Sequence, residues 1–250
     1  MNDLVRSELR KQRSVRLPAI ALTAAAAGGA LTAIAIITTA GHGSNPPLHR
    51  GSLTELVHAP YAIVAGAALL LGIFGVAGEF RHQTITATLL ASPRRARLLT
   101  AKVVVHAGLG ALLAIVAAVV NLAVAIPWLS SQDVALSGPV DVAHVLIGGV
   151  AAGALFGAAG AGLGALIVNQ TAAVTVSLVW LLAVEGLVVS FTSTPTIQRW
   201  LPGGALSTVA QAASGPDAGL QFWATAGCAI AYAATLIAAG AFRIVHCDVT

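Results

Sequence analysis

Residues 78–102 read GEFRHQTITATLLASPRRARLLTAK and separate two long apolar stretches of the chain. Residues 80–91 contain no Gly or Pro and predict a short helix, with Glu79 at its start, where exposed backbone N–H groups favour an anion. Pro93 then suits the first position of a second helix, with Ser92 as its N-cap. This stretch holds five of the thirteen Lys and Arg residues, namely Arg81, Arg94, Arg95, Arg97 and Lys102. We therefore expect a surface helix, a break and a basic approach to a membrane span. Composition alone fits equally well a solvated loop whose arginines only fix the topology.

The composition is that of an integral membrane protein. The chain has 250 residues, of which 57% are hydrophobic and 9% are charged, and its mean hydropathy is +0.88. A soluble domain carries about a quarter of its residues as charges. The net charge of +4 does not indicate a nucleic-acid partner, because the basic residues cluster beside apolar stretches. We expect a single all-α transmembrane domain over residues 1–250.

Six apolar stretches are each long enough to cross a hydrocarbon core of about 30 Å. We predict spans at residues 17–40, 57–77, 103–126, 142–168, 171–191 and 220–245. With these boundaries, eleven of the thirteen Lys and Arg lie on one side of the membrane, and Arg50 and Arg199 lie on the other. Positive residues favour the cytoplasmic side, so both termini are expected in the cytoplasm.

Residues 2–16 are strongly basic and have one apolar edge, formed by Leu4, Val5 and Leu9. This pattern predicts a helix that lies in the membrane interface, with its arginines toward anionic lipid. The alternative is a frayed tail that only enforces the topology. Between spans five and six, residues 192–219 contain Pro195, Trp200 and a Pro-Gly-Gly turn, which predict a re-entrant or interfacial element.

The loop between spans two and three resembles a motif of a known protein family. The ordered set Glu79-Phe80-Arg81, Thr84-Ile85, Leu89-Leu90, Pro93-Arg94-Arg95 and Lys102 resembles the signature of type-2 ABC-transporter permeases. In that family, this loop forms a coupling helix that docks into a separate ATP-hydrolysing subunit, and two permeases pair to enclose a pathway. The resemblance implies that the ATPase contacts are Glu79, Phe80, Arg81, Thr84 and Leu90, supported by Pro93, Arg94 and Arg95. The stretch Ser7 to Lys11 is similar to the family's amphipathic N-terminal helix, which implies that Glu8, Arg10 and Lys11 flank the same contact.

Three features inside the spans suggest further roles. Gly149, Gly153 and Gly157 recur every fourth residue in span four, a spacing that allows close helix approach in lipid. They fit an interface between two permeases or packing within one subunit. Glu185 is an acid within an apolar span, where a charge costs at least about 2.5 kcal/mol. It fits a pathway-lining group, with Asn121 and Trp180 as further pathway candidates, or an acid paired with a neighbouring helix.

The sequence lacks the motifs of catalysis. A phosphate-binding loop needs Gly-Lys-Ser/Thr, and neither Lys11 nor Lys102 follows a Gly. The seven His show no metal-ligand spacing. We therefore expect no cofactor, metal or catalytic residue in this chain, and ATP with Mg²⁺ on the partner subunit.

The expected function is that of the membrane subunit of a bacterial ABC exporter in the inner membrane, involved in the efflux of drug-like or amphipathic molecules and so in multidrug resistance. Lipid or peptide export fits nearly as well. The rival interpretation is a proton-coupled secondary transporter or channel that uses Glu185. A protein that senses or confers immunity without transport is a third.

Overall fold

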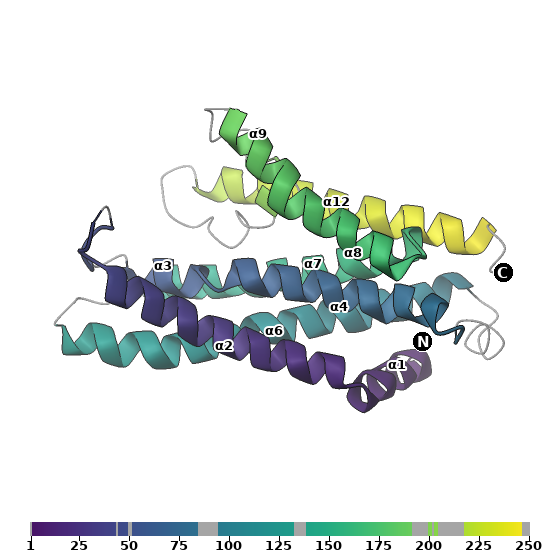
Figure 1. The fold of residues 1–250 in the computed structure, drawn as a ribbon, viewed down its shortest axis with the longest axis horizontal. Coiled ribbons are helices and arrows are strands. Elements are labelled where there is room, and N and C mark those ends of the chain that lie inside the picture. The colour runs from purple at the N-terminus through teal and green to yellow at the C-terminus, as the bar shows by residue number, and fades with distance from the viewer. Residues whose placement is uncertain are drawn as a thin grey trace.

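The structure is a computed structural model, which describes residues 2–43, 45–49, 52–84, 95–132, 139–191, 200–201, 203–204 and 218–246. Within these ranges the regular elements are all helical, and they run mostly side by side along the long axis of the molecule (Figure 1). They are α1 (Asn2–Ser14), α2 (Arg16–Thr39), α3 (Ser52–His58), α4 (Tyr61–Arg81), α6 (Arg95–Ser131), α7 (Pro139–Leu166), α8 (Gln170–Leu178), the π-helical turn η1 (Val179–Val184), α9 (Glu185–Phe191) and α12 (Ala218–His246).

Six helical segments of the described chain are long and apolar enough to cross a membrane. They are Arg16–Thr39, Ser52–Arg81, Arg95–Ser131, Val142–Leu166, Gln170–Val188 and Trp223–His246. The expectation of an all-helical, six-span membrane protein is confirmed at this level. The third segment is longer than expected, because α6 begins at Arg95 instead of residue 103 and has 37 residues. At 1.5 Å per residue it is about 55 Å long, so it projects beyond a hydrocarbon core of about 30 Å.

Helix α7 lies at the centre of the bundle and packs against α4, α6 and α12. A Cβ added at Gly153 would collide with the backbone of Gly110 in α6, and one at Gly157 would collide with the carbonyl of His106. A Cβ at Gly149 would overlap the ring of Tyr61 in α4. The expected glycine stripe of span four therefore faces neighbouring helices of the same chain, where it permits close backbone approach.

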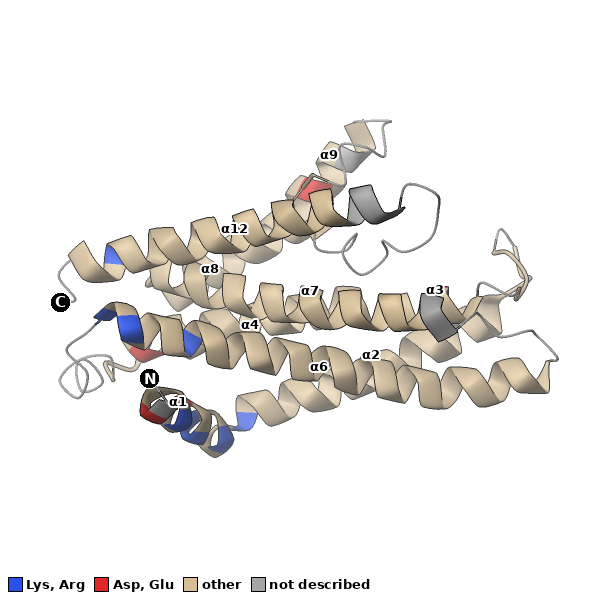
Figure 2. Cartoon of the chain, turned by 180° about the vertical axis from the view of Figure 1, so that it is seen from behind, with Lys and Arg blue, Asp and Glu red and all other residues tan. Residues whose placement is uncertain are grey.

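The described Lys and Arg residues gather at one end of the bundle (Figure 2). They belong to α1, the first residue of α2, the last turn of α4, the first turns of α6 and the last turn of α12. We call this the basic end. Helix α1 lies there, at an angle to α2 (Figure 1), and it contacts α6 and α2.

The prediction that Glu79 starts a new helix is wrong. Helix α4 continues through Glu79 to Arg81 and ends in a Schellman motif, in which Thr84 N–H bonds Glu79 O at 3.0 Å and Gln83 N–H bonds Phe80 O at 3.2 Å. Gln83 takes the left-handed conformation, with φ of +54°. Because this turn interrupts the chain, residues 80–91 do not form one continuous helix.

Residues 85–94 lie outside the described residues, so the rest of the expected coupling helix is untested. The same holds for most of the expected re-entrant element, of which the structure describes Trp200, Leu201, Gly203 and Gly204. Span five also differs from the expected single α-helix. It is divided by the π-helical turn Val179–Val184, which ends directly before Glu185. Such single-turn π segments frequently mark functional sites.

Candidate functional site

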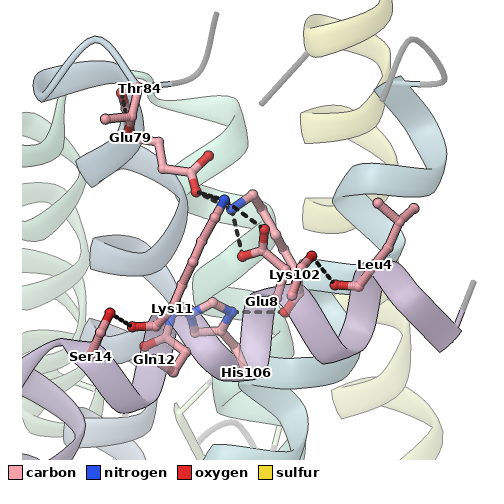
Figure 3. Close-up of polar contacts among 10 residues, drawn as sticks. Leu4, Glu8, Lys11, Gln12, Ser14, Glu79, Thr84, Lys102 and His106 are labelled. Atoms are coloured by element: carbon pink, nitrogen blue, oxygen red, sulfur yellow. Dashed lines mark hydrogen bonds and ion pairs between the residues drawn. The ribbon is translucent and has the colours of Figure 1, made fainter. Parts of the chain in front are cut away.

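Four charged side chains from three helices meet at the basic end (Figure 3). Lys102 Nζ of α6 lies 2.6 Å from Glu79 Oε1 of α4 and 3.0 Å from Glu8 Oε2 of α1. Lys11 Nζ of α1 lies 3.0 Å from Glu8 Oε1 and 3.1 Å from Glu79 Oε1. Each lysine therefore bridges both carboxylates. We call these four residues the charge network.

The local sequence explains why the side chains converge. Glu8 and Lys11 are three residues apart in α1, so they lie on the same face of that helix. Glu79 lies in the last turn of α4, and Lys102 lies two turns into α6, so they bracket the loop between spans two and three. The side chains of Glu8 and Lys102 are each only 2% exposed. Charges buried this deeply require opposite charges beside them.

The network shifts the pKa values of the two residues of α1. Burial alone would raise the pKa of Glu8, but the charges and hydrogen bonds of Lys102 and Lys11 outweigh burial and lower it below its ordinary value of 4.5. Burial would lower the pKa of Lys11, yet Glu8 and Glu79 together raise it above its ordinary value of 10.5. Glu8 and Lys11 thus keep their charges near neutral pH.

Neutral hydrogen bonds extend the network along α6. His106 Nδ1 lies 2.8 Å from Lys102 O, which can only accept, so Nδ1 carries the proton and donates. His106 Nε2 is then the acceptor for the Gln12 side-chain N–H, at 3.3 Å. The His106 ring fits against α4 only because residue 75 is Gly, since a Cβ there would overlap the ring. Helix α1 is therefore fixed to α6 through Glu8 and Gln12.

A cavity of about 730 Å³ opens beside the network. Its wall includes residues of α1, the start of α2, the last turns of α4 and Gln170 at the start of α8. Glu8, Lys11 and Glu79 lie on its polar side, and Leu17 and Phe74 lie on its apolar side. The basic end thus holds both a rigid ionic contact and a space large enough for a small molecule.

The expected partner-docking residues differ in how far their side chains are exposed. Arg81 and Arg10 are exposed. Phe80 packs against the small apolar cluster that contains Val76, Leu99 and Ile244. Arg95 Nη1 donates to Ile244 O at 2.9 Å, which ties the start of α6 to the end of α12. Thr84 belongs to the turn after α4, and Leu90, Pro93 and Arg94 lie outside the described residues.

The expected pathway residues do not form one site. Asn121 is fully buried between α6 and α2, where its Nδ2 donates to Gly29 O at 3.1 Å. Trp180 and Glu185 do lie together, because Trp180 Nε1 donates to Glu185 Oε1 at 2.9 Å. The same oxygen accepts from Gly203 N–H at 2.7 Å, so Glu185 connects span five to the segment that precedes span six. Asn121 has no contact of this kind with either residue.

Trp180 also lines an apolar cavity of about 270 Å³ between α4, α7, the α8–η1 segment and α12. Leu69, Phe156, Leu163 and Leu236 are among its lining residues. The cavity lies beside the π-helical turn. An apolar molecule or acyl chain is the kind of occupant such walls favour.

Sequence reasoning missed the contribution of Lys102, Gln12, His106 and Gln170. It treated Lys102 as part of the basic approach to span three, although a lysine at the border of an apolar helix requires a counter-charge when it is buried. The acids able to supply it, Glu8 and Glu79, were assigned to partner docking. No spacing signal could have placed Gln170, because it comes from the distant start of α8.

Within the described residues, no group of three or more His, Cys, Asp or Glu could hold a metal ion. A scan against protein-family models found no match, and a search of curated proteins found no relative.

Proposed function

We propose that this chain is the membrane subunit of a bacterial ABC exporter, driven by a separate ATP-hydrolysing subunit that binds ATP and Mg²⁺. A second permease copy, identical or homologous, completes the pathway. The basic end faces the cytoplasm in this proposal, because positive residues favour that side of the inner membrane. Both termini then lie in the cytoplasm.

The observation that carries the proposal is the position of the charge network. Glu79 and Lys102 flank the loop that resembles the coupling helix, and both contact Glu8 of α1 either directly or through Lys11. A force applied to this loop would therefore reach α1, α4 and α6 together. Helix α6 extends from Arg95 to Ser131, with its single proline, Pro127, near the far end, so the part before Pro127 can carry the motion across the membrane.

The contacts also refine the proposed docking surface. Phe80 and Arg95 anchor the ends of the loop to the bundle, as their contacts with the α12 end show. Arg81 is exposed at the same place and is available for an acidic groove of the ATPase. We assign Arg81 the first contact and treat Leu90, Pro93 and Arg94 as further contacts of the coupling segment.

The decisive test of docking uses a matched pair of charge reversals. The chain is co-expressed with the proposed ATP-hydrolysing subunit, and the two are purified together in detergent. We expect Arg81→Glu to abolish co-purification and Arg13→Glu, an exposed reversal on α1 outside the proposed contact set, to retain it. Unaltered binding of Arg81→Glu would exclude this docking surface.

The proposed cargo is an amphipathic or drug-like molecule, with lipid or peptide as alternatives within the same class. The apolar cavity beside Trp180 supports this choice, because its walls favour an apolar body. One observation favours the rival, a proton-coupled transporter. Glu185 lies directly after a π-helical turn and beside Trp180, a placement typical of a functional acid.

A further inference from the structure

Helix α1 has two opposite faces of different character. Glu8 and Gln12 lie on one face and hold the helix against α6. Arg6, Arg10 and Arg13 are spaced by four and three residues, which places them together about 150° around the helix from that face. All three are exposed, and none has an ion-pair partner among the described residues. Three positive charges therefore lie on the face of α1 that is turned away from the bundle, with no counter-charge from the described chain.

The position of α1 along the bundle places this face at the border of the apolar region. A single extended residue, Val15, joins α1 to α2, whose apolar sequence begins at Leu17. On α6, the residues that hold α1 are Lys102 and His106, and the apolar stretch of that helix begins between them, at Val103. Both α2 and α6 are candidate membrane spans. Helix α1 therefore lies where the hydrocarbon core of a bilayer meets its headgroups.

Apolar side chains lie among these arginines. Leu9 comes three residues after Arg6 and four before Arg13, so it shares their side of the helix, and it is 40% exposed. Val15, directly after the helix, is 53% exposed. This mixture is typical of a helix in the membrane interface, where apolar side chains reach the acyl chains and arginines stay with the headgroups. A soluble anion would neutralise the arginines but leave Leu9 and Val15 in water.

The charge of the exposed surface selects anionic lipid over zwitterionic lipid. Apart from the charge network, residues 3–16 expose four arginines, Arg16 included, and one acid, Asp3, which gives a formal side-chain charge of +3. Each arginine close to an anionic lipid surface strengthens binding about fivefold. Because the link to α2 keeps α1 at the membrane border, lipid headgroups are the anions that this face meets at the highest local concentration.

We propose that Arg6, Arg10 and Arg13 of α1 bind the headgroups of anionic phospholipids, while Leu9 contacts their acyl chains. The guanidinium groups donate to phosphate oxygens, a charge-assisted hydrogen bond whose planar geometry arginine matches. The opposite face keeps its contacts with α6, so lipid and charge network hold the helix from its two sides. The lipid contact requires neither ATP nor a partner subunit.

The first test compares two lipids that share their acyl chains and differ in headgroup charge. The purified chain in detergent, without any other subunit, is titrated with phosphatidylglycerol and with phosphatidylcholine, and bound lipids are counted by native mass spectrometry. We expect the first phosphatidylglycerol to bind at least about tenfold more tightly than the first phosphatidylcholine. Equal affinities would overturn the proposal. An excess of glycerol 3-phosphate should displace no phosphatidylglycerol, and displacement would assign this face to a soluble anion instead.

The second test locates the lipid preference on α1 with a matched pair of variants. Arg13→Gln and Arg97→Gln each remove one exposed positive charge from the basic end, so the two variants have the same net charge. Arg97 precedes Lys102 by five residues on α6 and lies about 7.5 Å farther from the apolar stretch. We expect Arg13→Gln to weaken binding of the first phosphatidylglycerol about fivefold, and Arg97→Gln to leave it unchanged. Equal losses would attribute the preference to net charge and contradict a site on α1.

The triple variant Arg6→Gln/Arg10→Gln/Arg13→Gln removes the whole basic face. It should bind phosphatidylglycerol no more tightly than phosphatidylcholine. Gln is a good helix former and the buried face is unchanged, so the unfolding temperature in lipid-free detergent should match that of the wild type. A lipid preference of wild-type size in this variant would place the site elsewhere and overturn the proposal.

These measurements are separate from the test of ATPase docking. If phosphatidylglycerol binds as expected while no ATPase associates with the chain, the lipid contact stands and the exporter proposal fails. If the ATPase associates but the two lipids bind equally, the exporter proposal stands and the lipid contact fails.

Discussion

The ammonium of Lys102 lies 2.6 Å from the Oε1 atom of Glu79, and this contact joins the last turn of α4 to the start of α6. The two residues are 23 positions apart in the chain and enclose the loop between spans two and three. Glu8 Oε2 of α1 lies 3.0 Å from the same ammonium, so α1 is part of the same contact. The loop is thus held at a fixed base formed by three helices.

Removing Lys102 should destabilise the protein strongly. In Lys102→Met, the carboxylates of Glu8 and Glu79 lose their shared buried cation, and breaking a buried pair costs about 3–5 kcal/mol. The expected result is a clear loss of thermal stability in detergent, measured by the unfolding temperature. Arg97→Met, an exposed substitution in the same helix, is the control. Equal unfolding temperatures for the two variants would show that Lys102 contributes nothing to stability.

The packing of α1 against α6 should depend on pH only at strongly acidic and strongly alkaline pH. The pKa of Glu8 is lowered, so its contribution to stability is present above the ordinary value of 4.5 and is lost as pH falls through the lower folded value. The pKa of Lys11 is raised, so its contribution is present below 10.5 and is lost as pH rises through the higher folded value. The backbone amides of α1 should therefore be equally protected from hydrogen exchange at every pH between these limits, after correction for the intrinsic exchange rate.

A matched variant identifies the source of any acid effect. In Glu8→Gln, α1 should already exchange faster at neutral pH and should show a smaller further change on acidification. A midpoint near neutral pH in the wild type would contradict the assigned charges.

The close packing of α7 should make its glycines sensitive to a single methyl group. Gly153→Ala places a Cβ against the Gly110 carbonyl, and overpacking of this kind costs about 1–3 kcal/mol. The control is Gly108→Ala in α6, where a Cβ would meet nothing within 4 Å. There the higher helix propensity of Ala should leave stability unchanged or raised, by up to about 1 kcal/mol. The unfolding temperature of Gly153→Ala should therefore fall. That of Gly108→Ala should stay unchanged or rise.

A substitution of Glu185 distinguishes an ATP-driven exporter from a proton-coupled transporter. Gln at this position retains an oxygen that can accept from Trp180 and Gly203, so the local fold should persist in Glu185→Gln. We expect ATP-driven transport to continue in this variant, because the carboxylate has a structural role in the exporter account. Loss of transport at every pH, with normal stability, would favour proton coupling instead.

The sequence was sufficient for the number and approximate position of the spans, because 20-residue apolar stretches are a strong signal. It failed at boundaries where helices extend beyond the apolar core. Helix α6 starts at Arg95 instead of residue 103, and α4 continues to Arg81, because hydropathy marks the lipid-facing part of a helix and not its end. The turn at Gln83 contains no Gly, the residue that usually predicts a left-handed helix end.

Side-chain partners were harder to predict than elements. The clustering of Glu8, Glu79 and Lys102 depends on how α1 lies against α6, which no local pattern specifies. Glu185 could be recognised as a costly acid in an apolar span, but its contact with Gly203 required the path of the chain after span five. The glycines of α7 were predicted to pack closely, yet the sequence alone could not choose between a neighbouring helix and a second subunit.

The most direct measurement of the exporter proposal is transport by the chain reconstituted in vesicles with the proposed ATP-hydrolysing subunit. Uptake of an amphipathic fluorescent cation into inside-out vesicles is followed with ATP and a proton ionophore, and separately with a proton gradient and no ATP. We predict uptake in the first condition and none in the second, with loss of uptake in the Arg81→Glu variant. Uptake by the chain alone, driven by the proton gradient without ATP, would contradict the account.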